Sequence, residues 1–576
     1  MIRLFDQHRI RSQKELDGIW KFVKEDGKEY ELPVPGCWEQ HPELLTFRGK
    51  GSFYKKVYVR KKTNIRLEFK GVSHTADVYF DDKFVVHHYN AFTAFSGIVK
   101  EVEAGEHTIR VDVDNTFGEH SSLHVPNDYY TYGGITRPVA FEEIGDIYIK
   151  NVHFKPYMQE SKWWAEITVE LENLGSEKTK IGKEDIANAL EKANETEKTE
   201  QVEITVNLNN ITCNKKAEVN ANSVTKITWN QEFDGVEEWN TENPKLYYLE
   251  TTLKSQEGDI IDDFIDRVGF REVSLKGYRL MLNGNPVFLK GFNRHEDYGT
   301  IGCALPLQLI VQDMDLMQEV GSNAVRTCHY PNDERFLDLC DERGMMVWEE
   351  NHARGFDLTR MQNPNFEKQC EDCIAEMIDQ HYNHPAIVIW GILNECASET
   401  AEGREMYKKQ FEQIKALDTS RPHTFATCRH FKDICLDLPD IVSFNMYSGW
   451  YQDVTVKERH EKEMDWIASA GGEGKPVIVS EFGGAAIYGY RDRGRCKWSE
   501  ERQADLIREN LEVYRDDARI TGTFIWQFAD CKVTEEEWFA SRARCHNNKG
   551  VVDEYRRPKE AFDVVKELFP TMTGNN

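Results

Sequence analysis

The sequence predicts a multidomain fold in which two antiparallel β-sandwiches precede a C-terminal (β/α)8 TIM barrel. Up to about residue 270, short runs of β-branched and aromatic residues are separated by turn signals, which is typical of sandwiches. From about Leu280 onward, short apolar runs alternate with longer helical patterns, which indicates a barrel. The length of 576 residues suits three or four domains of ordinary size.

Composition excludes several classes of function. With 72 basic and 99 acidic residues the net charge is −27, which argues against nucleic acid or an anionic membrane as a partner. The sequence has no apolar run long enough for a membrane helix, and its first residues lack the apolar core of a signal peptide. The 13 cysteines include one close pair, Cys370 and Cys373, with no second pair to complete a zinc site. We therefore predict a cytoplasmic protein with reduced thiols.

The first sandwich is predicted over residues 1–148. Asp81 and Asp82 form a hairpin signal between two of its strands. The clearest strand patterns in this region are Tyr54–Val59, Ile65–Phe69, Ala76–Phe80 and His107–Val113.

The second sandwich is predicted over residues 149–272, a length that suits an immunoglobulin-like domain. Its strand patterns include Trp163–Leu171, Val202–Leu208 and Tyr247–Lys254. Between them lies a charged stretch, Glu177–Glu200, which we interpret as a solvated insertion with a short helix at Ile181–Leu190.

The barrel is predicted over residues 273–576, where every apolar run ends in polar residues. Helices are expected at Leu307–Val320, Asp333–Arg343, Phe366–Tyr382, Gly403–Leu417 and Glu500–Arg515. The polar residues that end the strands are Glu349 and Glu350, Asn394 and Glu395, Asn445, Glu481, and Gln527. Reactive groups of such barrels lie at the C-terminal ends of the strands, so these side chains should point into one mouth.

Two of these polar ends are lone carboxylates that follow strongly apolar strands. Counting strands back from the C-terminus places Glu481 on the seventh strand and Glu395 on the fourth, across the barrel from each other. A facing pair of carboxyl groups is what glycoside hydrolysis requires, with one acid to protonate the leaving oxygen and one carboxylate to attack.

Motifs in this order resemble glycoside hydrolase family two and, within it, the bacterial, gut-type β-glucuronidases. The motifs are Leu16–Trp20, Val34–Glu39, Tyr132–Arg137, Asp266–Arg271, Asn283–Gly291 and Asn323–Pro331. The resemblance covers nearly the whole chain. It implies that the first sandwich is a sugar-binding jelly roll and that the second is immunoglobulin-like.

The resemblance also implies roles for site residues. Glu395 would be the general acid/base and Glu481 the nucleophile of a retaining double displacement. Asn394 would donate to the sugar 2-hydroxyl. The other residues that match sugar-binding positions of the family are His295, Asn445, Tyr447, Tyr451 and Trp526.

Specificity is indicated by Asn547 and Lys549, an Asn-x-Lys motif that binds the C6 carboxylate of the sugar in β-glucuronidases. A cation and an amide donor together give charge-assisted hydrogen bonds to a carboxylate. Of two preceding arginines, Arg544 is predicted to join this site, with Arg542 as the alternative. In the jelly roll, Asp128 matches the acidic residue that reaches over to the sugar.

The sequence thus predicts a retaining exo-β-glucuronidase that uses no metal and no cofactor. A β-galacturonidase is the nearest alternative, since the C4 epimer presents the same carboxylate. A β-galactosidase or β-mannosidase, and a non-catalytic carbohydrate-binding protein, are further alternatives. The segment Asn351–Phe366 is short, which suggests an open entrance that admits larger aglycones or saccharides. The resemblance implies a homo-oligomer, with tetramers common among family members.

Overall fold

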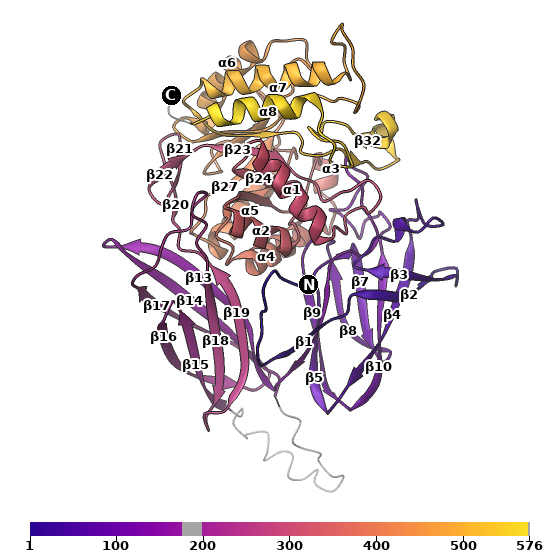
Figure 1. Cartoon of the computed structure of the whole chain (residues 1–576), viewed down its shortest axis with the longest axis vertical. Helices are drawn as coiled ribbons and strands as arrows, with labels where there is room; N and C mark the ends of the chain where they lie inside the picture. Colours follow the sequence, from indigo (N-terminus) through magenta and orange to yellow (C-terminus); the bar gives the residue numbers. More distant parts are fainter. Residues whose placement is uncertain (176–198, 574–576) are drawn as a thin grey trace.

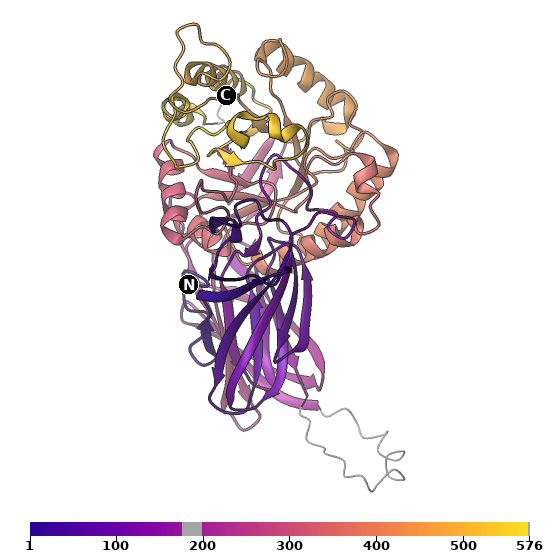
Figure 2. The same ribbon diagram turned by 90° about the vertical axis from the view of Figure 1, so that its right-hand side faces the viewer.

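The computed structural model describes residues 1–175 and 199–573. Two β-sandwiches lie side by side on the same side of a barrel, below it in both views (Figures 1 and 2). The helix predicted at Ile181–Leu190 lies outside the described residues. No helix in the described part of the chain is long and apolar enough to cross a membrane.

The first sandwich pairs a four-stranded sheet, ordered β1-β12-β5-β9, with a six-stranded sheet, ordered β3-β2-β4-β10-β7-β8. A small pair, β6 with β11, completes it. Asp81 and Asp82 both have positive φ, 47° and 61°, and form the predicted turn between β7 and β8. The strands are β1 (Ser12–Glu15), β2 (Gly18–Lys24), β3 (Glu29–Val34), β4 (Lys50–Val59), β5 (Thr63–Phe69), β6 (Val72–Ser73), β7 (Thr75–Phe80), β8 (Lys83–Tyr89), β9 (Phe95–Val102), β10 (Gly105–Asp114), β11 (Gly134–Ile135) and β12 (Val139–Ile144).

The second sandwich packs sheet β13-β14-β17 against sheet β16-β15-β18-β19. Alternate residues of β14 are buried, as a sheet with one face in the core requires. Its strands are β13 (Ile147–Gln159), β14 (Lys162–Asn173), β15 (Thr199–Leu208), β16 (Ile211–Asn220), β17 (Ser223–Phe233), β18 (Tyr247–Ser255) and β19 (Ile260–Val268). We propose that the domain boundaries lie at about residues 148 and 272, where the chain leaves one core for the next.

A short sheet of β20 (Val273–Lys276), β21 (Arg279–Leu282) and β22 (Asn285–Val287) leads into a closed barrel of eight parallel strands. Most residues of these strands are buried, because both faces of the barrel wall are covered. The barrel strands are β23 (Leu289–Asn293), β24 (Ala324–Thr327), β25 (Met346–Glu350), β26 (Ile387–Ile392), β27 (His423–Thr427), β28 (Val442–Asn445), β29 (Val477–Phe482) and β30 (Ile520–Ile525). The predicted fold class is therefore confirmed.

The helices around the barrel begin where side chains can cap them. Asp333, Thr400 and Ser499 accept hydrogen bonds from the first turns of α2, α5 and α7. The helices are α1 (Leu307–Glu319), α2 (Glu334–Arg343), α3 (Leu358–Met361), α4 (Phe366–His381), α5 (Ala401–Leu417), α6 (Val456–Ile467), α7 (Glu500–Arg515) and α8 (Glu560–Leu568). The five predicted helices match α1, α2, α4, α5 and α7 to within two residues.

Buried ion pairs fix the first sandwich against the barrel. Arg3 donates to Asp338 of α2 at 2.8 Å, and Lys70 lies 2.6 Å from Glu334. Removing one partner of such a pair leaves an uncompensated buried charge, so the pairs hold one docked arrangement. The connection from β10 to β11 carries Asp128 to the barrel mouth.

Candidate active site

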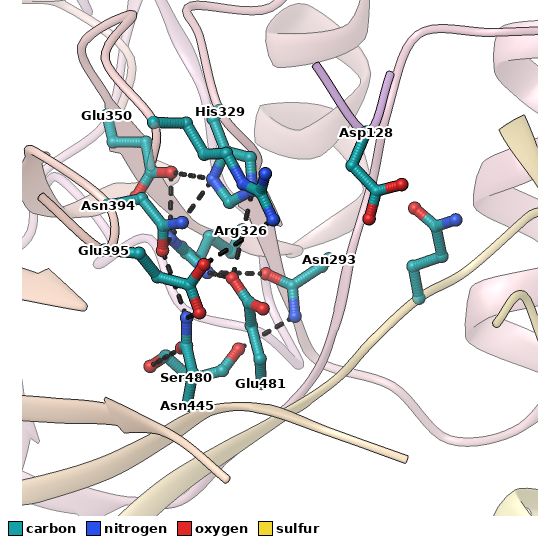
Figure 3. Close-up of polar contacts among 12 residues, drawn as sticks. Asp128, Asn293, Arg326, His329, Glu350, Asn394, Glu395, Asn445, Ser480 and Glu481 are labelled. Atoms are coloured by element: carbon teal, nitrogen blue, oxygen red, sulfur yellow. Dashed lines mark hydrogen bonds and ion pairs between the residues drawn. The ribbon is translucent and has the colours of Figure 1, made fainter. Parts of the chain in front are cut away.

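Glu395 and Glu481 meet at the mouth of the barrel. Glu481 belongs to β29, the seventh barrel strand, and Glu395 follows β26, the fourth. Figure 3 shows their carboxyl groups pointing toward one another. Leu393 and Glu395 have positive φ of 35° and 55°, an uncommon conformation that often marks functional sites. The turn is held by the Glu395 amide, which donates to Ala426 at 2.8 Å.

Glu481 is held by two donors. Arg326 Nη1 donates to Oε1 at 3.1 Å, and the Tyr447 hydroxyl donates to Oε2 at 2.7 Å. Burial and the facing Glu395 carboxyl raise the pKa of Glu481 to about 7, while Arg326 and Tyr447 act in the opposite direction. Both donors favour the carboxylate form of Glu481.

Arg326 is the centre of the buried network beneath the two glutamates. Its guanidinium donates twice to Glu350 at 2.9 Å and once to Asn394 Oδ1 at 2.8 Å. His329 shares the same Glu350 carboxylate through Nδ1 at 2.8 Å. Because Oδ1 of Asn394 is occupied, its amide orientation is fixed. Within the described part of the chain, Nδ2 of Asn394 is buried without a partner, so it is available to a sugar hydroxyl.

Glu395 is oriented by one residue from another barrel strand and one from a loop. Asn445 Nδ2 donates to Glu395 Oε1 at 2.9 Å, and Arg354 Nη2 lies 3.5 Å from Oε2. Arg354 comes from the short segment after β25, and its Nη1 also donates to Asn127 Oδ1 at 2.9 Å. Its Nε is buried and has no partner among the described residues, which makes Arg354 a donor for a bound ligand.

The opposite side of the site carries the cations. Arg542 forms a two-pronged ion pair with Asp128, and Asn547 Nδ2 donates to the same carboxylate at 3.0 Å. Lys549 is only 1% exposed; among the described residues it forms no ion pair, although it hydrogen-bonds Tyr451 and feels the charge of Asp128. Its Nζ lies 5.3 Å from the Tyr451 ring. Burial and neighbouring Arg542 lower the pKa of Lys549.

The structure separates the two arginines that the sequence leaves as alternatives. Arg542 lines the cavity, whereas Arg544 turns away, pairs with Glu554 at 3.0 Å and has a side chain that is 48% exposed. The preference for Arg544 over Arg542 therefore conflicts with the structure. The reason is local: Arg544 has a φ of 58°, and this kink sends the two side chains in different directions.

His295 and Trp526 lie at the base of the site. His295 Nδ1 is 3.1 Å from the Tyr330 hydroxyl, and its ring packs on Tyr129. Burial lowers the pKa of His295 to about 3, so the ring is neutral. Trp526 stacks on His329 with ring centroids 5.1 Å apart. His295, Cys328 and His329 lie close enough together to share a metal ion, but the chemistry of two facing carboxyls does not require one, and we assign none to them.

These side chains enclose an open cavity of about 300 Å³. Sequence reasoning missed Arg354, Cys428, His430, Gln452 and Trp538 in its lining. Cys428 and His430 follow β27, and the residues after this strand match no family motif. The alternation of strands and helices was the one sequence signal that could have placed them at the barrel mouth. The cavity is lined by Asp128, Arg354, Glu395, Cys428, His430, Asn445, Tyr447, Tyr451, Gln452, Glu481, Trp526, Trp538, Arg542 and Lys549.

Two facing carboxyls at the mouth of a barrel, with unpaired donors around them, are what a glycoside hydrolase requires. Models of glycosyl hydrolases family 2 match residues 147–271, and those of its TIM barrel domain match residues 273–573. The chain therefore belongs to glycosyl hydrolase family 2. The resemblance to bacterial β-glucuronidases is confirmed by its relatives.

Three relatives illustrate the similarity. A β-galacturonidase from Eisenbergiella tayi, solved with bound galacturonate, is 43% identical, and all of both chains align with a TM-score of 0.93. A putative β-glucuronidase of Formosa agariphila is 26% identical over 97% of this chain and 70% of its own. The β-glucuronidase of Sus scrofa is 25% identical over 98% of this chain and 91% of its own.

Proposed function

We propose that the protein is a retaining, exo-acting β-D-uronidase, which removes a terminal hexuronic acid from a conjugate or saccharide. The observation that carries this proposal is the buried Lys549 ammonium, which lines the cavity and, among the described residues, has no carboxylate partner. A buried unpaired charge is costly, and a substrate carboxylate would relieve that cost. Neutral hexosides would leave the charge unpaired.

The proposed mechanism uses the two glutamates in turn. Glu481 attacks the anomeric carbon while Glu395 gives its proton to the glycosidic oxygen, which releases the aglycone and leaves a covalent glycosyl ester on Glu481. Glu395, now ionised, takes a proton from water, and the resulting hydroxide-like oxygen displaces Glu481. The two inversions retain the β configuration. Asn394 Nδ2 is placed to donate to the 2-hydroxyl, and Arg326 and Tyr447 stabilise the departing Glu481 carboxylate.

The uronate carboxylate is proposed to bind Lys549, with Asn547 and Arg542 beside it. Asp128 holds both of these donors before substrate arrives, so it orients them.

We propose β-galacturonide as the preferred substrate, because the relative that is 43% identical over the full chain is a β-galacturonidase. β-Glucuronide is the second candidate, since the curated β-glucuronidases are 24–32% identical. A cytoplasmic location and a homo-oligomeric state remain predictions.

A panel of 4-nitrophenyl β-glycosides tests the proposal directly. The galacturonide, glucuronide, galactoside and glucoside are compared by kcat/KM under one set of conditions. The kcat/KM for each uronide should exceed that for both hexosides by about 100-fold or more, which is the gain expected from a charged hydrogen bond in a buried site. Faster hydrolysis of a hexoside than of both uronides would contradict a uronidase. A glucuronide preferred over the galacturonide would reverse the order of the two candidates.

Replacing Lys549 should remove the preference for uronides. For Lys549→Met we expect kcat/KM on the best uronide to fall by roughly 100-fold, which corresponds to about 3 kcal/mol for a lost charged contact. The same variant should act on the hexosides at least as fast as the wild type, because it no longer buries an unpaired charge. Lys56→Met, at a side chain that is 72% exposed, is the matched control and should change nothing. Equal losses on uronides and hexosides would show that Lys549 does not recognise the carboxylate.

The pair of glutamates should give activity an alkaline limit. Burial and the charge of the facing Glu395 raise the pKa of Glu481 to about 7, and we take this value to describe loss of the last proton from the two carboxyls. The working state keeps that proton, so kcat/KM should fall about tenfold per pH unit as pH rises above roughly 7. Glu395→Ala, assayed on a dinitrophenyl uronide whose departure needs no acid, should no longer show this fall of kcat/KM at high pH. A wild-type profile that stays flat to about pH 9 would contradict the assignment.

A further inference from the structure

We propose that the outer rim of the cavity is a binding site for a neutral sugar residue, the aglycone that leaves when the uronide is cleaved, with Trp538 as its stacking platform. This inference rests on the proposed function and adds to it the chemical class of the leaving group. The rim consists of Cys428, His430, Tyr451, Gln452 and Trp538, which come from the loops after β27, β28 and β30.

The position of the rim follows from the chemistry of the two glutamates. The leaving oxygen receives its proton from Glu395, so the aglycone must lie on that side of the cavity. The segment after β27 is bound there: Arg429 Nη2 donates to the backbone carbonyl of Glu395 at 3.2 Å. Cys428 and His430, on either side of Arg429, therefore face the leaving group from the Glu395 side, and they line the same cavity.

Two exposed aromatic rings are the unusual feature of the rim. Trp538 is 54% exposed and Tyr451 is 59% exposed, although each lines the cavity. The Trp538 ring has two neighbours: the Arg542 guanidinium lies 5.1 Å from its centroid, and the Phe539 ring lies 4.3 Å from it. An exposed ring offers a flat apolar surface, and the exposed Gln452 adds an amide to the lining of the same cavity. A flat face with hydrogen-bonding groups next to it suits the apolar and hydroxyl-bearing sides of a sugar ring.

The charges of the rim favour a neutral sugar over a second uronic acid. Each basic side chain in or next to the rim already has a carboxylate partner within the described residues. Arg542 pairs with Asp128, Arg429 lies 3.2 Å from Glu399, and His430 Nδ1 lies 2.6 Å from Glu463. Lys549, which forms no ion pair among the described residues, is buried in the inner part of the cavity, where the cleaved uronate would bind. An anionic aglycone would have to displace one of these partners, whereas a neutral sugar would not.

The size of the cavity agrees with this division. A volume of about 300 Å³ is at the lower limit for small-ligand sites, so it suits one sugar ring in the inner part. The next ring would then lie on the rim, where the Tyr451 and Trp538 rings are exposed.

The test compares two poor leaving groups that differ only in the aglycone ring. The substrates are a methyl β-uronide and a disaccharide in which the same uronic acid is β-linked to a neutral hexose. The wild type should favour the disaccharide by about tenfold in kcat/KM, and Trp538→Ala should lower kcat/KM for the disaccharide by roughly tenfold, mainly through KM. The methyl uronide should change less than about twofold. Trp538→Tyr should retain most of the activity on the disaccharide.

Other outcomes separate the possible failures. Equal losses of Trp538→Ala on both substrates would show that the ring only supports Arg542, which overturns the inference. So would an unchanged disaccharide rate, or a disaccharide of two uronic acids that outperforms the neutral one. Tyr58→Ala, at a 65% exposed ring on the first sandwich, is the control for loss of a surface aromatic. If the wild type cleaves hexosides but no uronide, the proposed function itself fails, and this inference fails with it.

Discussion

Glu481→Gln is expected to lower kcat on the best nitrophenyl uronide by about 10⁴-fold or more. The variant has no carboxylate to attack the anomeric carbon, and loss of a covalent nucleophile typically removes most of the rate enhancement. The amide is nearly isosteric, and Arg326 can still donate to its carbonyl oxygen. The fold and the uronate site should therefore persist, and product uronic acid should bind with nearly unchanged affinity by calorimetry.

The control for this variant lies at the other end of the same barrel strand, away from the mouth. Glu473 is exposed in the turn that precedes β29, so Glu473→Gln should leave kcat unchanged. Trapping of the intermediate is an independent readout. A fluorinated uronide should accumulate as a glycosyl ester on the wild type, which intact-protein mass spectrometry can detect, whereas Glu481→Gln should carry no ester. More than a few per cent of wild-type activity in the Gln variant, or label on another residue, would overturn the role of Glu481.

The large-scale fold was predictable because the apolar runs, their polar ends and the alternation of strands with helices all indicate the same barrel. The apolar runs of the barrel are buried on both faces, so they read as continuous hydrophobic segments that end in polar residues. That regularity was enough to count strands and place Glu395 and Glu481 opposite each other. The α5 start was predicted two residues late, because Ala401 and Glu402 precede the apolar positions that define the periodicity.

The site was less predictable where it depends on contacts between distant segments. Arg354 is joined to Asn127, which is 227 residues away, and this pair exists only because the first sandwich docks on the barrel. No local pattern reports such a contact. The choice between Arg542 and Arg544 depended on one residue with positive φ, and an arginine gives no sequence signal for that conformation.

The net charge of −27 says little about how a carboxylate is recognised. It describes the average surface, whereas recognition of a carboxylate depends on a few side chains at close range. Lys549 is buried, and salt screens the field of the distant acidic surface within about 8–10 Å. The acidic surface therefore provides little steering for a uronide, and we expect the local site to determine affinity.

Glu395→Ala is expected to separate the two steps of the reaction. On a methyl uronide or a disaccharide, which need protonation of the leaving oxygen, kcat/KM should fall by up to about 10⁴-fold. On a dinitrophenyl uronide the first step needs no acid, so the loss should be much smaller, and hydrolysis of the glycosyl ester should become rate-limiting. Equal losses on both classes of substrate would contradict the acid/base role.

Azide should then rescue the slow second step of Glu395→Ala and yield a β-glycosyl azide. Removing the carboxylate opens space beside Glu481 and leaves Arg354, whose Nη2 lies 3.5 Å from Glu395 Oε2 in the intact site, as an unpaired cation that attracts a small anion. Rescue should therefore be weaker in the double variant Glu395→Ala/Arg354→Met than in the single variant, and nuclear magnetic resonance of the product distinguishes the anomers. An α-azide would mean that the anion enters from the face opposite to the one Glu395 occupies, and it would rule out the double displacement. A β-azide formed at equal rates in both variants would keep the double displacement and remove Arg354 from its proposed place beside the acid/base.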